Sequence, residues 1–171
     1  MFEFLIVICL ILLNGFFAMS EMSVMTSRKS RLKQQALHSK RAARALALAE
    51  KPEAFLSTVQ IGITLIGVLS GAFSGANLGQ RLSQFLFELG LAANVADAAG
   101  VGIVVGVITY ASLIVGELVP KQIALRDPES VAVRVAPAMT VMARLSLPLV
   151  WLLDRSGKFL LWVLGHREDA Q

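Results

Sequence analysis

The sequence has few charged residues, two histidines and a single cysteine, and each shortage excludes a class of protein. Charged residues make up 16% of the 171, hydrophobic residues make up 56%, and the mean hydropathy is +0.68. This balance excludes intrinsic disorder and does not suit a water-soluble globule. Cys9 lies alone in an apolar run, so a disulfide scaffold is excluded. His38 and His166 have no nucleophile or metal-ligand spacing around them, so the sequence indicates no enzyme.

Three stretches of the chain are long and apolar enough to cross a lipid bilayer, which takes about 20 mostly apolar residues per helix. They cover about residues 4–26, 54–79 and 98–120. Three further segments are expected to be helical and to lie outside the bilayer: a basic cytoplasmic segment at 28–52, a short external helix at 81–96 and a juxtamembrane belt at 128–165. The sequence therefore predicts an all-α membrane protein, a single transmembrane domain over residues 1–171 with three transmembrane helices.

The belt at 128–165 leaves two alternatives open. Its charged residues divide it into uncharged pieces of about nine residues, too short to cross a bilayer, and they are Arg134, Arg144, Asp154, Arg155 and Lys158. Pro137 and Pro148 are expected to interrupt a helix there. A fourth crossing would place Arg144 near the bilayer centre at a cost of about 2.5 to 3.5 kcal/mol. Helices along the cytoplasmic interface are therefore favoured, with Trp151 and Trp162 as aromatic anchors.

Lysines and arginines lie in blocks that predict the orientation. Eight of the sixteen fall between Arg28 and Lys51, only Arg81 lies between the second and third spans, and seven follow the third span. The positive-inside rule then places the N-terminus outside the cell membrane and the C-terminus in the cytoplasm. Ala18-Met19-Ser20 resembles a signal-peptide cleavage site, but the positive charge follows the span, which favours an uncleaved helix.

The basic segment at 28–52 is explained first by this topology signal. Its functional alternative is contact with anionic membrane lipid or with an acidic region of a partner domain. Nucleic acid is disfavoured as a partner because the segment has no interleaved aromatic residues and the membrane already accounts for its charge.

Polar side chains inside a span are site candidates, because lipid offers them no hydrogen bonds. Asn14 and Glu21 are seven residues apart and share one helical face, and the same holds for Tyr110 and Glu117. Pro120 is expected to loosen its helix and free carbonyl oxygens. Small or polar residues also form a stripe along the second span, at Ser57, Gln60, Thr64, Gly67, Gly71 and Ser74. Such oxygen ligands suit Mg²⁺, Ca²⁺ or Na⁺ rather than zinc or copper.

Each of these features also has a purely structural interpretation. Glu117 is expected to pair with Lys121 four residues on, and Glu21 with Arg28 or Lys29. Glycines spaced four apart let helices pack closely, within the chain or between the copies of a homodimer. This spacing occurs at Gly67, Gly71 and Gly75, and again at Gly102 and Gly106.

Three runs of the sequence, one in each span, together resemble a known family. They are Asn14 to Glu21 (NGFFAMSE), Thr58 to Ala76 (TVQIGITLIGVLSGAFSGA) and Val115 to Lys121 (VGELVPK). They are similar to the transmembrane domain of the CorC and cyclin M (CNNM) family of Mg²⁺ transport proteins, and the likeness covers almost the whole chain. The resemblance implies three transmembrane helices with a cytoplasmic juxtamembrane belt, assembled as a homodimer.

The resemblance also implies a dehydrated Mg²⁺ site that opens to the cytoplasm, with export coupled to Na⁺ entry. Carried over onto this sequence, the site has Glu117 as its acidic ligand. The further candidate ligands are Asn14, Ser20, Glu21, Gln60, Gly62, Thr64 and Gly67. Ala18 departs from the family pattern, because it offers no hydroxyl where other members carry serine. Family members continue into a pair of CBS nucleotide-binding modules, so this chain is expected to be the membrane part of a longer protein.

Two functions follow as hypotheses. In the first, a cavity among the spans strips Mg²⁺ of water, and Glu117 neutralises part of the charge that would otherwise be too costly to bury. In the second, the domain is a non-transporting membrane anchor that senses Mg²⁺ and relays a signal to partner proteins.

Overall fold

The computed structural model describes residues 2–164, except for the surroundings of Gly75 and the side chain of Ala76. Within that part of the chain the only regular elements are helices, so the predicted all-α class is confirmed. In chain order they are α1 (Phe2–Thr26), α2 (Lys29–Ala36), α3 (Lys40–Glu50), α4 (Pro52–Phe73), the π-helical segment η1 (Ser74–Gly79), α5 (Gln80–Glu88), α6 (Ala93–Leu113), the π-helical segment η2 (Ile114–Leu118), α7 (Val119–Arg126) and α8 (Pro128–Val163).

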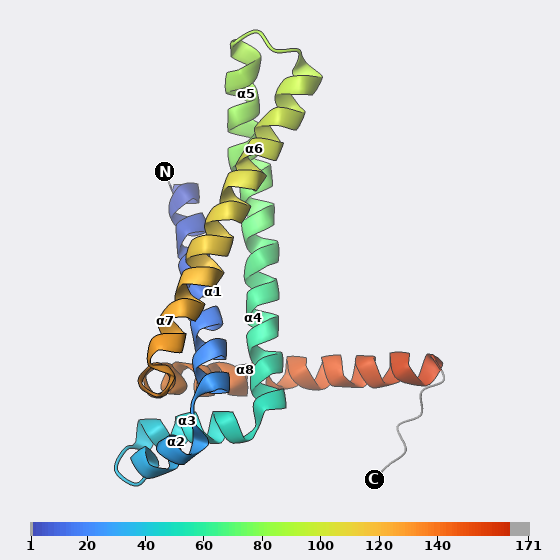
Figure 1. Cartoon of the computed structure of the whole chain (residues 1–171). Helices are drawn as coiled ribbons and strands as arrows, with labels where there is room; N and C mark the ends of the chain where they lie inside the picture. Colours follow the sequence, from blue (N-terminus) through green and yellow to red (C-terminus); the bar gives the residue numbers. More distant parts are fainter. Residues whose placement is uncertain (1, 165–171) are drawn as a thin grey trace.

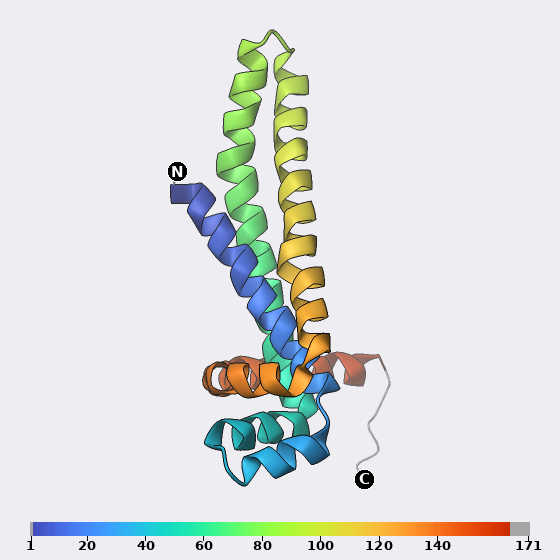
Figure 2. The same cartoon turned by 60° about the vertical axis from the view of Figure 1, so that its left-hand side comes forward.

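Two long helical rods form a hairpin that stands beside α1 (Figures 1 and 2). The first rod joins α4, η1 and α5 over Pro52–Glu88, and the second joins α6, η2 and α7 over Ala93–Arg126. Gly90, at φ 96°, makes the turn between them, in a conformation that favours glycine. The separate helix expected at 81–96 is therefore not found. Residues 80–88 continue the first rod, because residues 80–89 contain neither glycine nor proline.

Helix α8 lies across the foot of α1, α4 and α7 in both views, with α2 and α3 on its other side (Figures 1 and 2). It is one unbroken helix that contains Pro137 and Pro148, so the expected interruption at these prolines is wrong. Each proline removes one backbone hydrogen bond, but Ala136 and Met139 are fully buried around the first of them and hold the helix in place.

Asp127 caps the N-terminus of α8. Its carboxylate accepts a hydrogen bond from the backbone N–H of Ser130 at 3.3 Å. The hydrogen bonds from Ser130 hold the pKa of the Asp127 carboxyl below its usual range. The predicted basic segment at 28–52 is the helix pair α2 and α3 just before α4, and Ser39 caps α3 by accepting from the N–H of Ala42.

The hydrophobic core lies at the foot of the bundle, where α1, α3, α4 and α8 meet. Its fully or almost fully buried side chains include Phe17, Val24, Phe55, Val59 and Met139. A buried carboxylate joins this core to α2: Glu129 is 6% exposed and accepts from the backbone N–H of Arg28 at 3.3 Å. The side chains of the outer half of α8 are not covered by the rest of the chain, and both Trp151 and Trp162 are exposed.

Four helices in the described part of the chain are long and apolar enough to cross a membrane. Besides α1 and the two rods, the fourth is α8. Its course across the ends of the others distinguishes it from them (Figures 1 and 2).

The glycines that pack helices together are not those that the four-residue spacing indicated. A Cβ atom built on Gly67, Gly71, Gly102 or Gly106 would meet nothing within 4 Å, so none of these packs closely within the chain. The side-chain position of Gly75 lies outside the described structure. Their role at a homodimer contact stays a prediction.

The close contacts are made by other glycines. A Cβ on Gly62 would lie 2.6 Å from the ring of Phe17, and one on Gly15 would lie 3.0 Å from Cγ of Pro120. Gly100 likewise allows the second rod to approach Ser83 of the first. Gly62 and Gly15 let α1 cross both rods, which brings its polar residues against η2.

Candidate cation site

A cavity of about 260 Å³ lies where α1 crosses the two rods. Its lining combines isoleucine, leucine and valine side chains with residues that carry oxygen. The polar residues that line it are Asn14, Ser70, Ser74, Thr109, Ser112 and Glu117. Glu117 is the one ionisable residue among the described residues of this lining, which we call the inner cavity.

Asn14 connects α1 to η2 through a hydrogen bond inside the bundle. Its Nδ2 donates to the carbonyl oxygen of Gly116 at 3.0 Å. In an unbroken α-helix that carbonyl would accept from the N–H of residue 120, but Pro120 has no N–H. The Asn14 amide therefore replaces the missing donor, and its own carbonyl oxygen stays available at the cavity.

Each rod contributes one residue of a π-helical segment to the inner cavity, Ser74 of η1 and Glu117 of η2. In η2 the N–H of Val119 donates to the carbonyl of Ile114, five residues back. The carbonyl of Val115 thereby loses the partner that an α-helix would supply, as the carbonyl of Gly116 does through Pro120. In η1, Ser74 is buried and its hydroxyl donates to the carbonyls of Ser70 and Gly71. Short π-helical segments are rare and frequently mark functional sites.

Lys121 stands between two carboxylates at the edge of this cavity. Its Nζ donates to Oε1 of Glu117 at 2.9 Å, so the predicted pair four residues apart is confirmed. The same Nζ is 3.9 Å from Oε2 of Glu21. Glu21 thus pairs with Lys121 and not with Arg28 or Lys29, because α1 and α7 pack side by side while the chain turns away after Thr26.

A second, larger cavity of about 780 Å³ lies beyond Glu21, between α1, the start of α4 and the outer half of α8. Its lining includes Glu21, Glu53 and Asp154, with Ser57 and Gln60. Lys121 therefore links an acid of this outer acidic cavity to Glu117 of the inner one.

The predicted ligands divide between these places. Asn14, Gly67 and Glu117 line the inner cavity together. Glu21 and Gln60 line the outer cavity. Ser20, Gly62 and Thr64 line neither of these two cavities.

Local geometry explains why these three line neither cavity. The hydroxyl of Ser20 is buried and donates to the carbonyl of Phe16 at 2.7 Å. Gly62 packs against Phe17, and Thr64 is exposed. Sequence reasoning missed Ser70, Thr109 and Ser112 as lining residues. The seven-residue spacing of Tyr110 and Glu117 drew attention to Tyr110, which is exposed, and not to Thr109 and Ser112 on the neighbouring face of the helix.

The donor set of the inner cavity consists of one carboxylate, one amide oxygen, several hydroxyls and backbone carbonyls. Such oxygens suit a hard cation. Within residues 2–164, no three His, Cys, Asp or Glu side chains gather closely enough to hold a metal ion. A cation here would therefore be held mainly by neutral oxygens and balanced by a single carboxylate, whose present partner is the ammonium of Lys121.

Known proteins are similar to this chain along almost all of its length. The profile described as the cyclin M transmembrane N-terminal domain matches residues 4–171. The chain is 49% identical over 164 residues to the UPF0053 protein sll0260 of Synechocystis, which covers 95% of this chain and 37% of that protein. It is 32% identical over 158 residues to the UPF0053 inner membrane protein YfjD of Escherichia coli, covering 92% of this chain and 34% of that protein.

A third relative carries a substrate in its name. The chain is 31% identical over 148 residues to the polyamine export protein of Escherichia coli, covering 86% of this chain and 33% of that protein. The chain thus spans about a third of the length of these curated relatives. Its apolar helices and its likeness to an inner membrane protein identify a multi-pass membrane protein.

Proposed function

Since the chain belongs to the cyclin M transmembrane-domain family, we propose that it moves Mg²⁺ across the membrane through the inner cavity. The observation that carries the proposal is Glu117, set in η2 among hydroxyl and carbonyl oxygens and opposite Asn14. These oxygens replace the water that Mg²⁺ gives up reluctantly, and the carboxylate offsets part of its charge.

Lys121 gives the cavity a charge that an arriving cation must displace. Its ammonium already sits 2.9 Å from Glu117, so Mg²⁺ and Lys121 compete for the same carboxylate. Glu21, 3.9 Å away, is the acid to which Lys121 turns when Glu117 is taken by the metal. The outer acidic cavity attracts cations towards this point.

The membrane arrangement that suits this function has three crossings. α1 and the two rods cross, and α8 lies along the cytoplasmic interface with Trp151 and Trp162 as anchors. The N-terminus is then outside, the basic helices α2 and α3 are cytoplasmic, and the outer acidic cavity opens on the cytoplasmic side. The direction that we propose is export, coupled to Na⁺ entry. The copies form a homodimer through the open glycine faces of the rods.

The test is Mg²⁺ binding and flux on the purified full chain, measured by calorimetry and with an Mg²⁺ indicator inside liposomes. Glu117→Gln keeps the shape but removes the charge, so it should abolish both binding and flux. Glu88→Gln removes an exposed acid of α5 far along the chain from the cavity and should change neither. Unchanged Mg²⁺ affinity in Glu117→Gln would refute the site. Tight binding without flux would favour the sensor.

A companion variant tests the competition by Lys121. Replacing it in Lys121→Met should tighten Mg²⁺ binding about fivefold, since a partly exposed ion pair contributes up to about 1 kcal/mol. Lys121→Arg keeps the positive charge and should leave the affinity nearly unchanged. Weaker binding in Lys121→Met would show that Lys121 supports the metal and does not compete with it.

A second candidate substrate is a polyamine, because one relative is named for polyamine export. The outer cavity, at about 780 Å³, has room for an extended organic cation and places Glu21, Glu53 and Asp154 along its lining. The same liposomes loaded with radiolabelled spermidine separate the two functions. Spermidine flux that Mg²⁺ does not inhibit would favour the polyamine.

A further inference from the structure

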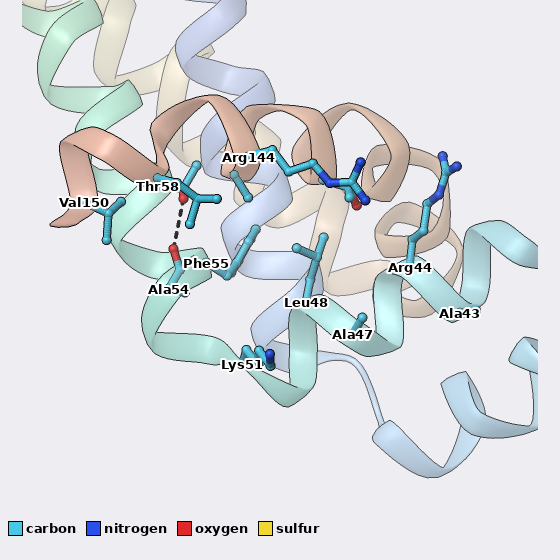
Figure 3. Close-up of a pocket in the computed structure, with 13 residues that line it drawn as sticks. Ala43, Arg44, Ala47, Leu48, Lys51, Ala54, Phe55, Thr58, Arg144 and Val150 are labelled. Atoms are coloured by element: carbon cyan, nitrogen blue, oxygen red, sulfur yellow. Dashed lines mark hydrogen bonds between the residues drawn. The ribbon is translucent and has the colours of Figure 1, made fainter.

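A third cavity lies away from both cation cavities, between α3, the start of α4 and α8 (Figure 3). Its volume is about 420 Å³, within the range of about 300 to 1,000 Å³ that ligand pockets occupy. Most of its wall is hydrocarbon, contributed by Ala47, Leu48, Phe55, Ala143, Leu147 and Val150. Figure 3 shows Leu48 and Phe55 pointing into the space between α3 and α8.

Three cations and no acid stand among the thirteen described residues of this lining. They are Arg44 of α3, Lys51 at the corner before α4, and Arg144 of α8. In Figure 3 the guanidinium groups of Arg44 and Arg144 lie towards the same end of the cavity. None of the three forms an ion pair with another described residue, so their charge is available to a ligand.

The position of this groove relates it to a membrane surface. α8 and α3 lie across the foot of the steep helices α1, α4 and α7, at the lower end of the bundle (Figures 1 and 2). An apolar wall next to unpaired cations at that level complements an amphiphile with an acyl chain and a negative headgroup. The cation cavities have the opposite chemistry, because their charged linings are acidic.

We propose that this groove binds one anionic phospholipid of the surrounding membrane. The acyl chain packs against Leu48, Phe55 and Leu147, and the phosphate is bound by Arg44 and Arg144. The bound lipid then joins α3 to α8 across a gap that the chain does not fill by itself. This inference is independent of which cation the protein moves.

The test is native mass spectrometry on the delipidated full chain, titrated with palmitoyl-oleoyl phosphatidylglycerol. Phosphatidylcholine with the same chains gives the neutral comparison, and glycerol phosphate gives the headgroup alone. We expect one saturable phosphatidylglycerol per chain, bound about tenfold more tightly than phosphatidylcholine, and no competition by glycerol phosphate.

A matched pair of variants separates the groove from general surface charge. Arg44→Gln with Arg144→Gln should weaken phosphatidylglycerol binding about tenfold. Arg41→Gln with Arg134→Gln removes the same charge from exposed positions of the same two helices and should leave binding unchanged. Ala143→Phe fills the groove and should remove the bound lipid while both arginines remain.

Three results would overturn the proposal. Equal losses in the two double variants would assign the binding to overall charge. Competition by glycerol phosphate would make the ligand a free phosphate. No binding of either lipid to the wild type would mean that a second copy or another part of the chain fills the groove. Unchanged helicity by circular dichroism shows for each variant that the fold is retained.

Discussion

Asn14→Ala is the variant that most directly tests how the inner cavity is built. It removes the amide that donates to the carbonyl of Gly116 across the contact between α1 and η2. The carbonyl then has no replacement donor, because Pro120 cannot supply the bond that an α-helix would make there. The truncation opens little new space, since Asn14 already lines a cavity.

The magnitude follows from the kind of bond that is lost. Hydrogen bonds between helices in a membrane average about 0.6 kcal/mol and reach about 1.7 kcal/mol. A buried carbonyl left without a partner costs about 1 to 3 kcal/mol when measured in soluble proteins. The membrane value is the closer reference, because the loosened helices find other partners. We therefore expect Asn14→Ala to lower the free energy of unfolding by about 1 kcal/mol.

A double-mutant cycle isolates this bond from other effects of the change. In Pro120→Ala the new backbone N–H can donate to Gly116, so the amide of Asn14 is no longer needed. The cost of Asn14→Ala should fall from about 1 kcal/mol to near zero in that background. The free energies come from reversible unfolding of the purified chain in mixed micelles with increasing dodecyl sulfate.

The control is Thr109→Ala, which alters the same cavity without touching this hydrogen bond. Its cost should be equal in the two backgrounds, because Thr109 takes no part in the hydrogen bond between Asn14 and Gly116. An equal cost of Asn14→Ala in both backgrounds would refute the reasoning. It would mean that Asn14 stabilises the bundle by some other contact than the Gly116 carbonyl.

Two further changes test packing and burial with the same unfolding measurement. Gly62→Ala should lower the free energy of unfolding by about 1 to 3 kcal/mol, because its Cβ would lie 2.6 Å from the Phe17 ring. Gly67→Ala, whose Cβ would meet nothing within 4 Å, should be neutral or slightly stabilising. Similar costs for both variants would contradict the described crossing of α1 and α4. Glu129→Ala should cost about 1 to 3 kcal/mol by leaving the Arg28 N–H without its acceptor. Glu129→Gln keeps an acceptor and should cost less, so an equal loss would assign the effect to charge alone.

Much of the secondary structure was predictable from the sequence because it depends on local properties. The apolar runs near 4–26, 54–79 and 98–120 all lie within long helices. The ion pair of Glu117 and Lys121 was predictable for the same reason, since residues four apart on a helix face each other. The helices of the basic segment also follow from composition.

The wrong predictions concern positions where tertiary packing overrides a local sequence preference. The prolines of α8 did not interrupt it, and around Pro137 the burial of Ala136 and Met139 outweighed the missing hydrogen bond. The glycine spacing at Gly67 and Gly71 indicated packing, but within the chain the close approach of α1 uses Gly15 and Gly62. A spacing says which residues share a face and not which face meets a neighbour.

The sequence by itself determined that this is a helical membrane protein with a few polar residues in its spans, because hydropathy and helical periodicity belong to each segment separately. Only the tertiary structure decided that Asn14 faces the Gly116 carbonyl, that Lys121 stands between Glu21 and Glu117, and that serines and a threonine complete the inner cavity. The contacts of Asn14 with Gly116 and of Glu21 with Lys121 join residues about a hundred positions apart in the chain. They depend on the rotation and crossing of whole helices, which side-chain packing sets and no single segment encodes.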